Sequence, residues 1–583
     1  MSKGKRGIDW KQNFSSIRLE RFKAFEDSGN IELKPLTFII GKNSSGKSTI
    51  LKSIASLAQS VAKYEDTDYG GNRMYLFERN PHGEIILSGK GKFVDVGRFE
   101  DISSESIDKI STYSRENNLD PQERREILES RNFKISFGCG QSTIKRILRS
   151  YGLEDTEENI NAIKDLWISY KFEPSKDYVD SEMRELEIGK AVNNKNIGLS
   201  KDALLNVRTI VAPAKKWYIG KLDEGRVNYD AFEEGIKRRL GRFYLSEDTE
   251  DPLEKLALKK LNIKIEDIYP IVVDVVRLTH AYLNPINIME TPIAKKFLKI
   301  MKKEKMFISE NVGKSESKKK NKEKFSKYDV GFVIFKMMMT LFERKIQPLS
   351  LISDIISKEL SAVRYIGPLR SEPRREVHEA TEAFDQGTKG ENIVQYLNKA
   401  DKETKLKLHK TLQKLGMGKS TRIEHLRGRR GTKSGFLQLY VRLEDGSERQ
   451  LIDLGFGVSQ VLPILLECSV REKSTILLEQ PELHLHPGLQ TELAEVLLDS
   501  CDRDNQIIIE SHSVNMIERI RRRIREGKLH HTAVNVIYVG KNEEGTSRAD
   551  VLEFDEDGDF TRPWPDEDGF FGERDREVFS DLF

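Results

Sequence analysis

The sequence predicts an α/β fold with a largely parallel sheet. Near the N-terminus, the apolar run LTFII (residues 36–40) is typical of a strand and precedes the amphipathic stretch STILKSIASLAQSV, typical of a helix. Strand-like runs return near the C-terminus as TILLE, QIIIE and NVIYVG, again with helical stretches between them. Strands that alternate with helices favour a parallel sheet covered by helices. We therefore expect one α/β head built from both chain ends.

The length and texture of the chain predict more than one structural unit. At 583 residues the chain is too long for one simple core. Residues 1–105 are assigned to the N-terminal part of the head and residues 361–583 to its C-terminal part. Between them, residues 106–360 are richer in charge and carry helical patterns such as IEDIYPIVVDVVRLTHAYL. This middle region is predicted to be a mainly helical insertion.

Composition argues against several classes of protein. Hydrophobic residues make up 37% and charged residues 33%, and the net charge of +3 gives no overall basic footprint for nucleic acid. No apolar run follows the basic start of the chain, and Val330 to Phe342 is too short to span a bilayer and contains Lys336. Three cysteines far apart in sequence do not suggest a disulfide scaffold or a zinc module. We expect a cytoplasmic protein that does not enter a membrane.

The most specific motif is a phosphate-binding loop of the form GxxxxGK[ST]. It follows a strand-like run and opens a helical stretch, which is the context that phosphate binding requires. Glycines let the backbone curl around phosphate oxygens, and the helix N-terminus favours an anion. Lys47 is expected to reach the β- and γ-phosphates and the Ser48 hydroxyl to ligate Mg²⁺. The candidate nucleotide-binding residues are Gly41, Lys42, Asn43, Ser44, Ser45, Gly46, Lys47, Ser48 and Thr49.

Two apolar runs near the C-terminus end in residues suited to the same chemistry. TILLE ends at Glu479, the form of a Walker B strand that offers a carboxylate to Mg²⁺. The run QIIIE is followed by His512, whose imidazole is suited to sensing a γ-phosphate. Upstream, the glycine-containing stretch DLGFGVSQ (residues 453–460) leads into the apolar run VLPILLE and offers backbone N–H groups to an anion.

In this order, the pieces resemble the ABC ATPases of the SMC and OLD type. They look most like OLD-like ATPases, which carry EQPELHLHP (here Glu479 to Pro487), YIGPLR (Tyr365 to Arg370) and a C-terminal WP…GFF element (Trp564-Pro565 and residues 569–571). The opening IRLERFKAFED (residues 17–27) resembles the first strand of that head. The likeness covers about residues 14–105 and 362–583. It implies an ABC-type P-loop ATPase head.

The resemblance implies a role for each matching residue. Glu479 is the Walker B carboxylate and, with Ser48, a Mg²⁺ ligand, while His512 is the switch histidine. A signature loop that meets ATP bound to another head is formed by Gly455, Phe456, Gly457 and Ser459. Two ATP molecules would then lie between two heads, in a homodimer or higher oligomer.

Three departures from the family pattern affect catalysis. Gln480 stands where the family has a catalytic glutamate, and an amide can orient water but cannot accept a proton as a carboxylate does. Glu482 is an alternative for that role, or hydrolysis is slow. Gly455 replaces the signature serine, with Ser459 as a substitute one turn later. No glutamine lies between residues 59 and 122, so no Q-loop is evident.

Four polar segments leave alternatives open. Lys314 to Lys327 is either a solvated loop or an arm that contacts DNA or RNA phosphates. His484 and His486 suggest a metal, although a structural role or one at the ATP interface is favoured. Asp555 to Asp559 is interpreted as a polar hairpin turn rather than a Ca²⁺ loop or a TOPRIM-like nuclease motif. Arg519 to Arg525 is a basic helix whose arginines either pair with acids or contact DNA or a partner.

These patterns lead to one main functional hypothesis and two others. The main one is an ATPase that binds ATP and Mg²⁺, dimerises around ATP and regulates a separate HNH-type nuclease. The resemblance to Septu or retron-associated PtuA-type ATPases implies a role in anti-phage defence. An alternative is a DNA repair or chromosome-maintenance ATPase of the RecF or SMC kind, although no sustained heptads support it. A transporter ATPase subunit is argued against by the charged insertion and the missing Q-loop.

Overall fold

The computed structural model describes the two ends of the chain and parts of the region between them. The described residues are 6–7, 10–65, 73–77, 86–87, 93–95, 133–150, 154–163, 166–174, 181–189, 210–211, 298–299, 301–302, 307–309, 324–326, 355–379, 385–427, 433–543 and 545–565. In these ranges no helix is long and apolar enough to cross a membrane.

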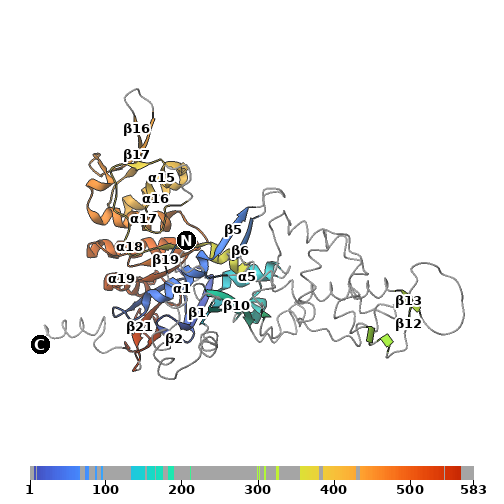
Figure 1. Cartoon of the computed structure of the whole chain (residues 1–583). Helices are drawn as coiled ribbons and strands as arrows, with labels where there is room; N and C mark the ends of the chain where they lie inside the picture. Colours follow the sequence, from blue (N-terminus) through green and yellow to red (C-terminus); the bar gives the residue numbers. More distant parts are fainter. Residues whose placement is uncertain are drawn as a thin grey trace, which may run out of the picture.

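A six-stranded sheet lies at the centre of the fold (Figure 1). Its order is β14 (Val363–Ile366), β19 (Thr475–Glu479), β20 (Gln506–Glu510), β4 (Leu36–Gly41), β21 (Val534–Lys541) and β22 (Ser547–Glu553). All neighbours pair in parallel except β21 and β22. Only β4 comes from the N-terminal end, and it lies between two strands from the C-terminal end. The predicted α/β head built from both chain ends is therefore confirmed.

The central strands are apolar because both faces of the sheet are covered. Every residue of β4, β19 and β20 is buried, as expected for strands between two layers. Side chains alternate between the faces along each strand. Ile39 packs with helix α1 (Lys47–Gln59) on one face, whereas Phe38 and Ile40 pack with α17 (Phe456–Val470), α18 (Pro487–Cys501) and α19 (Val514–Arg525) on the other.

A second, antiparallel sheet packs on the α1 side of the head. Its strands are β1 (Phe14–Phe22), β2 (Phe25–Asp27), β3 (Ile31–Glu32), β7 (Ile86–Leu87), β8 (Phe133–Cys139), β9 (Trp167–Pro174), β10 (Ser181–Gly189) and β11 (Ile210–Val211). Strand β8 pairs with β1 along most of its length. Residues 133–139, which the sequence assigned to the insertion, therefore lie in the same antiparallel sheet as the N-terminal strand β1. Helices α5 (Gln141–Ser150) and α6 (Glu157–Ile163) accompany these strands. The boundaries at residues 105 and 360, and the helical character of the insertion, stay predictions.

A smaller lobe follows β14 and carries the start of α17 (Figure 1). It contains strands β15 (Val377–His378), β16 (Ser420–Arg427), β17 (Lys433–Arg442) and β18 (Glu448–Gln450), helices α15 (Ile393–Lys399) and α16 (Lys402–Lys414), and the short helix η3 (Leu451–Asp453). Two further strand pairs, β5 (Val61–Glu65) with β6 (Arg73–Phe77) and β12 (Phe307–Ser309) with β13 (Lys324–Ser326), complete the described strands. Helix α16 packs on α17, so the lobe positions the segment that leads into α17.

Candidate nucleotide site

The phosphate loop joins the C-terminal end of β4 to the N-terminus of α1. Gly41 has φ 145° and Gly46 has φ 100°, conformations that favour glycine. A Cβ at Gly41 would lie 2.1 Å from the Val539 carbonyl oxygen, and one at Gly46 would lie 2.7 Å from the Ser547 Oγ. The loop therefore needs both glycines for space as well as for backbone conformation.

The loop is held from outside by strand β22 and by the turn between β1 and β2. The Ser547 hydroxyl donates to the Ser45 carbonyl at 2.6 Å, and the Ser547 backbone N–H donates to the Ala24 carbonyl at 2.9 Å. Ser547 is 5% exposed, so these bonds lie out of water. A preorganised loop loses less conformational entropy when it closes on an anion.

Lys47 lies across the loop that it follows. Its Nζ donates to the carbonyl oxygens of Gly41 at 3.0 Å and Lys42 at 2.7 Å. Burial lowers the pKa of the Lys47 ammonium, and the nearby Glu510 carboxylate partly opposes that shift. A buried cation satisfied by backbone carbonyls alone is well suited to an anion such as a triphosphate.

Glu479 ends β19 beside the loop. In the sheet register Glu479 pairs with Glu510, and Glu510 pairs with Ile39 of β4. Glu479 is 4% exposed, and its Oε1 has no hydrogen-bond partner among the described residues. Burial, followed by the charge of Glu510, raises the pKa of Glu479 from 4.5 to about 7. The carboxylate predicted for Walker B thus lies at the strand ends near the phosphate loop.

Gln480 lies in the turn that follows β19, and the Arg370 side chain contacts this turn. Gln480 has the left-handed φ of 44°. Its N–H donates to the Glu510 carbonyl at 2.7 Å, and its own carbonyl accepts from both Arg370 Nη1 and Nη2 at 3.1 Å. Arg370 is 5% exposed, and burial lowers the pKa of its guanidinium to about 10. The Arg370 backbone N–H also donates to Gln460 on α17, at 3.3 Å, so Arg370 links the turn after β19 to α17.

Glu482 and His512 connect the ends of β19 and β20. The Glu482 Oε1 accepts from the His512 backbone N–H at 2.6 Å. Burial raises the pKa of Glu482. The pKa of the half-buried His512 is lowered, first by burial and then by the positive charge of Lys47. Lys47, Glu479, Glu482 and His512 are therefore gathered at one edge of the sheet, although they come from opposite ends of the chain.

The predicted signature segment lies at the N-terminus of α17, which Gly455 precedes as N-cap. Phe456 is 47% exposed, and its ring meets the His484 ring edge-on at 4.7 Å. A Cβ at Gly457 would lie 2.9 Å from the His484 carbonyl oxygen. Ser459 is buried, and its hydroxyl donates to the Phe456 carbonyl at 2.8 Å. In the described structure, no hydrogen bond or ring contact joins this segment to the phosphate loop.

Other polar motifs have structural partners. The exposed His486 accepts from the Gly488 N–H at 3.3 Å and so caps α18. Asp555 accepts from the N–H groups of Asp557 and Asp559 at 3.0 and 2.9 Å, which confirms the predicted hairpin turn. The tail residues 569–571, and Lys314 to Lys327 apart from β13, lie outside the described residues.

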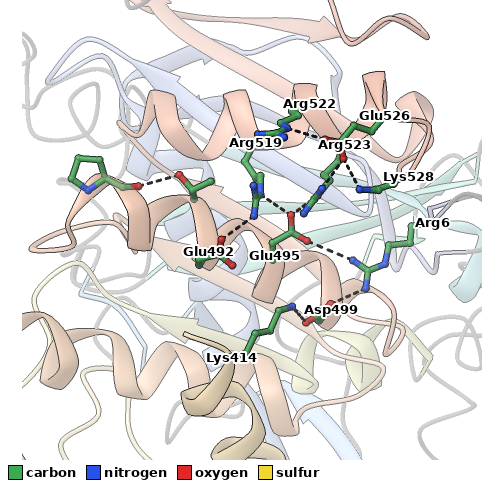
Figure 2. A network of polar contacts seen from close by, with 12 residues as sticks. Arg6, Lys414, Glu492, Glu495, Asp499, Arg519, Arg522, Arg523, Glu526 and Lys528 are labelled. Atoms are coloured by element: carbon green, nitrogen blue, oxygen red, sulfur yellow. Dashed lines mark hydrogen bonds and ion pairs between the residues drawn. The ribbon is translucent and has the colours of Figure 1, made fainter. Parts of the chain in front are cut away.

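The arginines of α19 pair with acids (Figure 2). Arg519 reaches Glu492 at 2.9 Å and Glu495 at 2.7 Å, and Arg523 reaches Glu495 at 2.5 Å. The network extends to Arg522, Glu526, Lys528, Arg6, Asp499 and Lys414. Arg521 and Arg525 reach Asp559. The first of the two interpretations, pairing with acids, is therefore confirmed for this helix.

Three residues near the site had no assigned role in the sequence. Tyr365 and Arg370 stand at the two ends of YIGPLR, and Glu510 is the last residue of QIIIE. Charge interactions couple all three to Glu479. Glu510 could have been found from the sequence, because it is an acid at the end of an apolar strand-like run, the same pattern that identified Glu479.

A family model of the AAA ATPase domain matches residues 13–517 of the chain. This chain belongs to the AAA ATPase domain family. The match spans β4, the phosphate loop, β19, β20 and the start of α19. No curated protein matches this AAA ATPase.

Solved structures similar to this AAA ATPase include SMC heads. One SMC head bound to the C-winged helix domain of ScpA is 11% identical, with 94% of this chain and 99% of that chain covered and a TM-score of 0.35. A head with coiled coil and joint from Pyrococcus yayanosii is 13% identical, with 98% and 99% covered and a TM-score of 0.32. The head from Thermotoga maritima is 8% identical, with 92% and 98% covered and a TM-score of 0.32. These TM-scores are low, so the fold assignment rests on the family match and the sheet.

The residues present fit a nucleotide with its magnesium ion. The two glycines give the loop its left-handed turns ahead of the α1 N-terminus, where an anion is favoured, and Lys47 supplies a cation. Glu479 offers an unpartnered carboxylate oxygen, and Ser48 offers a half-buried hydroxyl at the start of α1. Hard oxygen ligands of this kind suit Mg²⁺. When bound, the ion would neutralise charge on the phosphates.

Proposed function

We propose that this AAA ATPase hydrolyses ATP slowly, dimerises around ATP and regulates a separate nuclease in anti-phage defence. Lys47 and the N–H groups of residues 41–49 bind the phosphates. Ser48 and Glu479 hold Mg²⁺, and His512 senses the γ-phosphate. Gly455 and Phe456 of one head meet the nucleotide bound to the other.

One observation carries the dimer: the exposure of the signature turn. Phe456 is 47% exposed, and Gly455 has no atom within 4 Å of the position of a Cβ. A turn of this kind, with free space before a helix N-terminus, is suited to an anion brought by another molecule. Its bonds run within its own helix and to the turn after β19, not to the phosphate loop of the same chain.

Slow turnover is supported by the chemistry after β19. Gln480 offers an amide where a carboxylate would accept a proton. The alternative acid, Glu482, uses one carboxylate oxygen to hold the His512 N–H. That bond favours a positioning role for Glu482, in which it orients the switch histidine.

Regulation of a nuclease is the finer part of the proposal. It rests on the resemblance to PtuA-type ATPases and on the interpretation of Asp555 to Asp559 as a turn, since a polar turn leaves that motif without a nuclease role. Any cutting activity then belongs to an HNH-type partner, which nucleotide bound between the heads keeps silent.

The test is purification with associated proteins, followed by light scattering of the separated complex with and without saturating Mg-ATP. We expect the wild-type mass to rise with Mg-ATP, and Lys47→Ala to remain at its nucleotide-free mass. Equal masses for both proteins would contradict the ATP-dependent dimer. A co-purified HNH nuclease supports the defence role, whereas DNA-stimulated hydrolysis without such a partner would favour the RecF or SMC alternative.

A further inference from the structure

Two buried carboxylates lie side by side at the strand ends next to the phosphate loop. Glu479 and Glu510 are paired residues of the parallel strands β19 and β20. Each is only 4% exposed. The Glu479 Oε1 and the Glu510 Oε2 have no hydrogen-bond partner within the described ranges. Buried polar atoms of proteins nearly always have partners, so this pair calls for one.

Lys47, Lys52 and Arg370 interact by charge with this pair, but none of them donates a hydrogen bond to either of these two oxygens. Lys47 Nζ, which interacts with Glu510 by charge, donates to the carbonyls of Gly41 and Lys42 instead. The Arg370 guanidinium donates to the carbonyls of Pro368 and Gln480. Two like charges at this spacing repel each other unless a cation lies between them or a proton is taken up.

We propose that Glu510 is a second carboxylate ligand of the magnesium ion at this site, beside Glu479 and in addition to Ser48. This assignment rests on the proposed nucleotide site. The backbone carbonyl of Glu510 is fixed by the Gln480 N–H at 2.7 Å, and its strand pairs with β4, which leads directly into the phosphate loop. The parallel register thus places Glu510 between Glu479 and the loop.

Glu482 is a weaker candidate for the same ion. Its Oε2 also has no hydrogen-bond partner among the described residues, but its Oε1 accepts from the His512 N–H at 2.6 Å and the residue stands beyond the strand in the following turn. Glu510 has the same strand-end position as Glu479. A site with two carboxylates would hold the divalent ion more strongly, and would repel a triphosphate when the ion is missing.

The test measures binding of a fluorescent ATP analogue, first in EDTA and then during a titration with Mg²⁺. Glu510→Gln removes the charge and keeps the shape, and Glu467→Gln is the matched control. Glu467 is also 4% exposed, but it lies on α17, where it pairs with Arg471. Melting of each variant checks its fold, and Glu510→Asp, which keeps the charge, provides a second variant.

In Glu510→Gln we expect the Mg²⁺ concentration for half-maximal tightening to rise about tenfold or more. Binding in EDTA should be equal to or tighter than that of wild type, because one negative charge has been removed. The Mg²⁺ requirement of Glu510→Asp should lie between those of wild type and Glu510→Gln, and the requirement of Glu467→Gln should match that of wild type. Electron paramagnetic resonance of Mn²⁺ with ATP should show less bound metal in Glu510→Gln.

An unchanged Mg²⁺ requirement in folded Glu510→Gln would overturn the assignment. If that variant does not fold, a wild-type requirement in Glu510→Asp together with wild-type Mn²⁺ binding would do the same. Failure of the wild-type protein to bind ATP at any Mg²⁺ concentration contradicts the proposed function instead. The two failures are therefore distinguishable.

Discussion

The Glu482 carboxylate accepts a hydrogen bond from the His512 backbone N–H at 2.6 Å and so ties the turn after β19 to the end of β20. Both residues come from the predicted catalytic set. Their bond makes the position of His512 depend on a residue thirty positions away in sequence.

Glu482→Ala should loosen the His512 loop without emptying the phosphate loop. Loss of a buried hydrogen bond to a charged acceptor costs about 1.5–3 kcal/mol of unfolding free energy. We expect destabilisation in that range and reduced ATP turnover, with nucleotide binding retained. Glu482→Gln, which keeps an acceptor oxygen, should lie close to wild type in urea denaturation. Equal turnover losses in both variants would favour a chemical role for the carboxylate over a positioning one.

Arg370→Ala should destabilise the turn that follows β19, because Arg370 donates to the Gln480 carbonyl in that turn. The change leaves the Gln480 carbonyl without its two donors and removes a cation near Glu479 and Glu482. Breaking such a buried arrangement costs about 3 kcal/mol. Arg375→Ala provides the control, because Arg375 pairs with Asp453 in an exposed ion pair. We expect a clear fall in the denaturation midpoint for the first variant and none for the second. Similar denaturation midpoints for the two variants would contradict a stabilising role of Arg370 at this turn.

A comparison of Gly41, in the phosphate loop, with Gly446, outside it, separates the steric effect of an added methyl group from its effect on backbone conformation. Gly41→Ala places a methyl group 2.1 Å from the Val539 carbonyl oxygen, so the loop must move and ATP binding should be lost. Gly446 also has a positive φ, 86° against 145° for Gly41, but an added Cβ there would have nothing within 4 Å. Gly446→Ala should cost about 1 kcal/mol of stability and leave ATP binding unchanged. Calorimetric binding of ATP to both variants tests this difference.

Glu479 gives the nucleotide-free protein a pH-dependent stability. Its pKa is about 7 in the fold against an ordinary value of 4.5, so the folded state holds a proton that the unfolded chain releases. The stabilisation is complete below pH 4.5 and is lost as pH rises to about 7. The shift corresponds to about 3 kcal/mol. Urea denaturation between pH 5 and pH 8 should show this slope in wild type and a flatter one in Glu479→Gln. Parallel slopes would contradict it.

The sequence predicts the central sheet well because its strands are buried on both faces. Runs such as LTFII and QIIIE have no polar face, and only a covered parallel sheet explains several of them. The strands β8, β9 and β10 are harder to place, because they alternate polar and apolar residues and join β1 through β8, which lies more than a hundred residues from β1 in sequence. Their position depends on long-range pairing that local periodicity does not encode.

In the candidate site, too, some residues can be predicted from local sequence motifs and others only from the fold. Lys47, Glu479 and His512 stand in short motifs whose chemistry is local. Glu510 gains its importance only from the strand order, which places β20 between β19 and β4. Ser547 and Ser45 are separated by 502 positions in sequence, and Arg370 and Gln480 by 110. No sequence pattern of either partner predicts such a bond.

A complementation experiment with two inactive variants tests the shared site most directly. Lys47→Ala removes the phosphate-binding lysine, and Gly455→Glu places a negative charge at the signature turn, where a side chain has room. Each variant alone should fail to dimerise with Mg-ATP, although Gly455→Glu should still bind ATP. Mixed together, they combine one intact phosphate loop with one intact signature turn in a single heterodimer. The account predicts ATP-dependent heterodimers and partial recovery of hydrolysis in the mixture. A mixture that remains as inactive and as small as its separate components, with ATP still bound to Gly455→Glu, would contradict it.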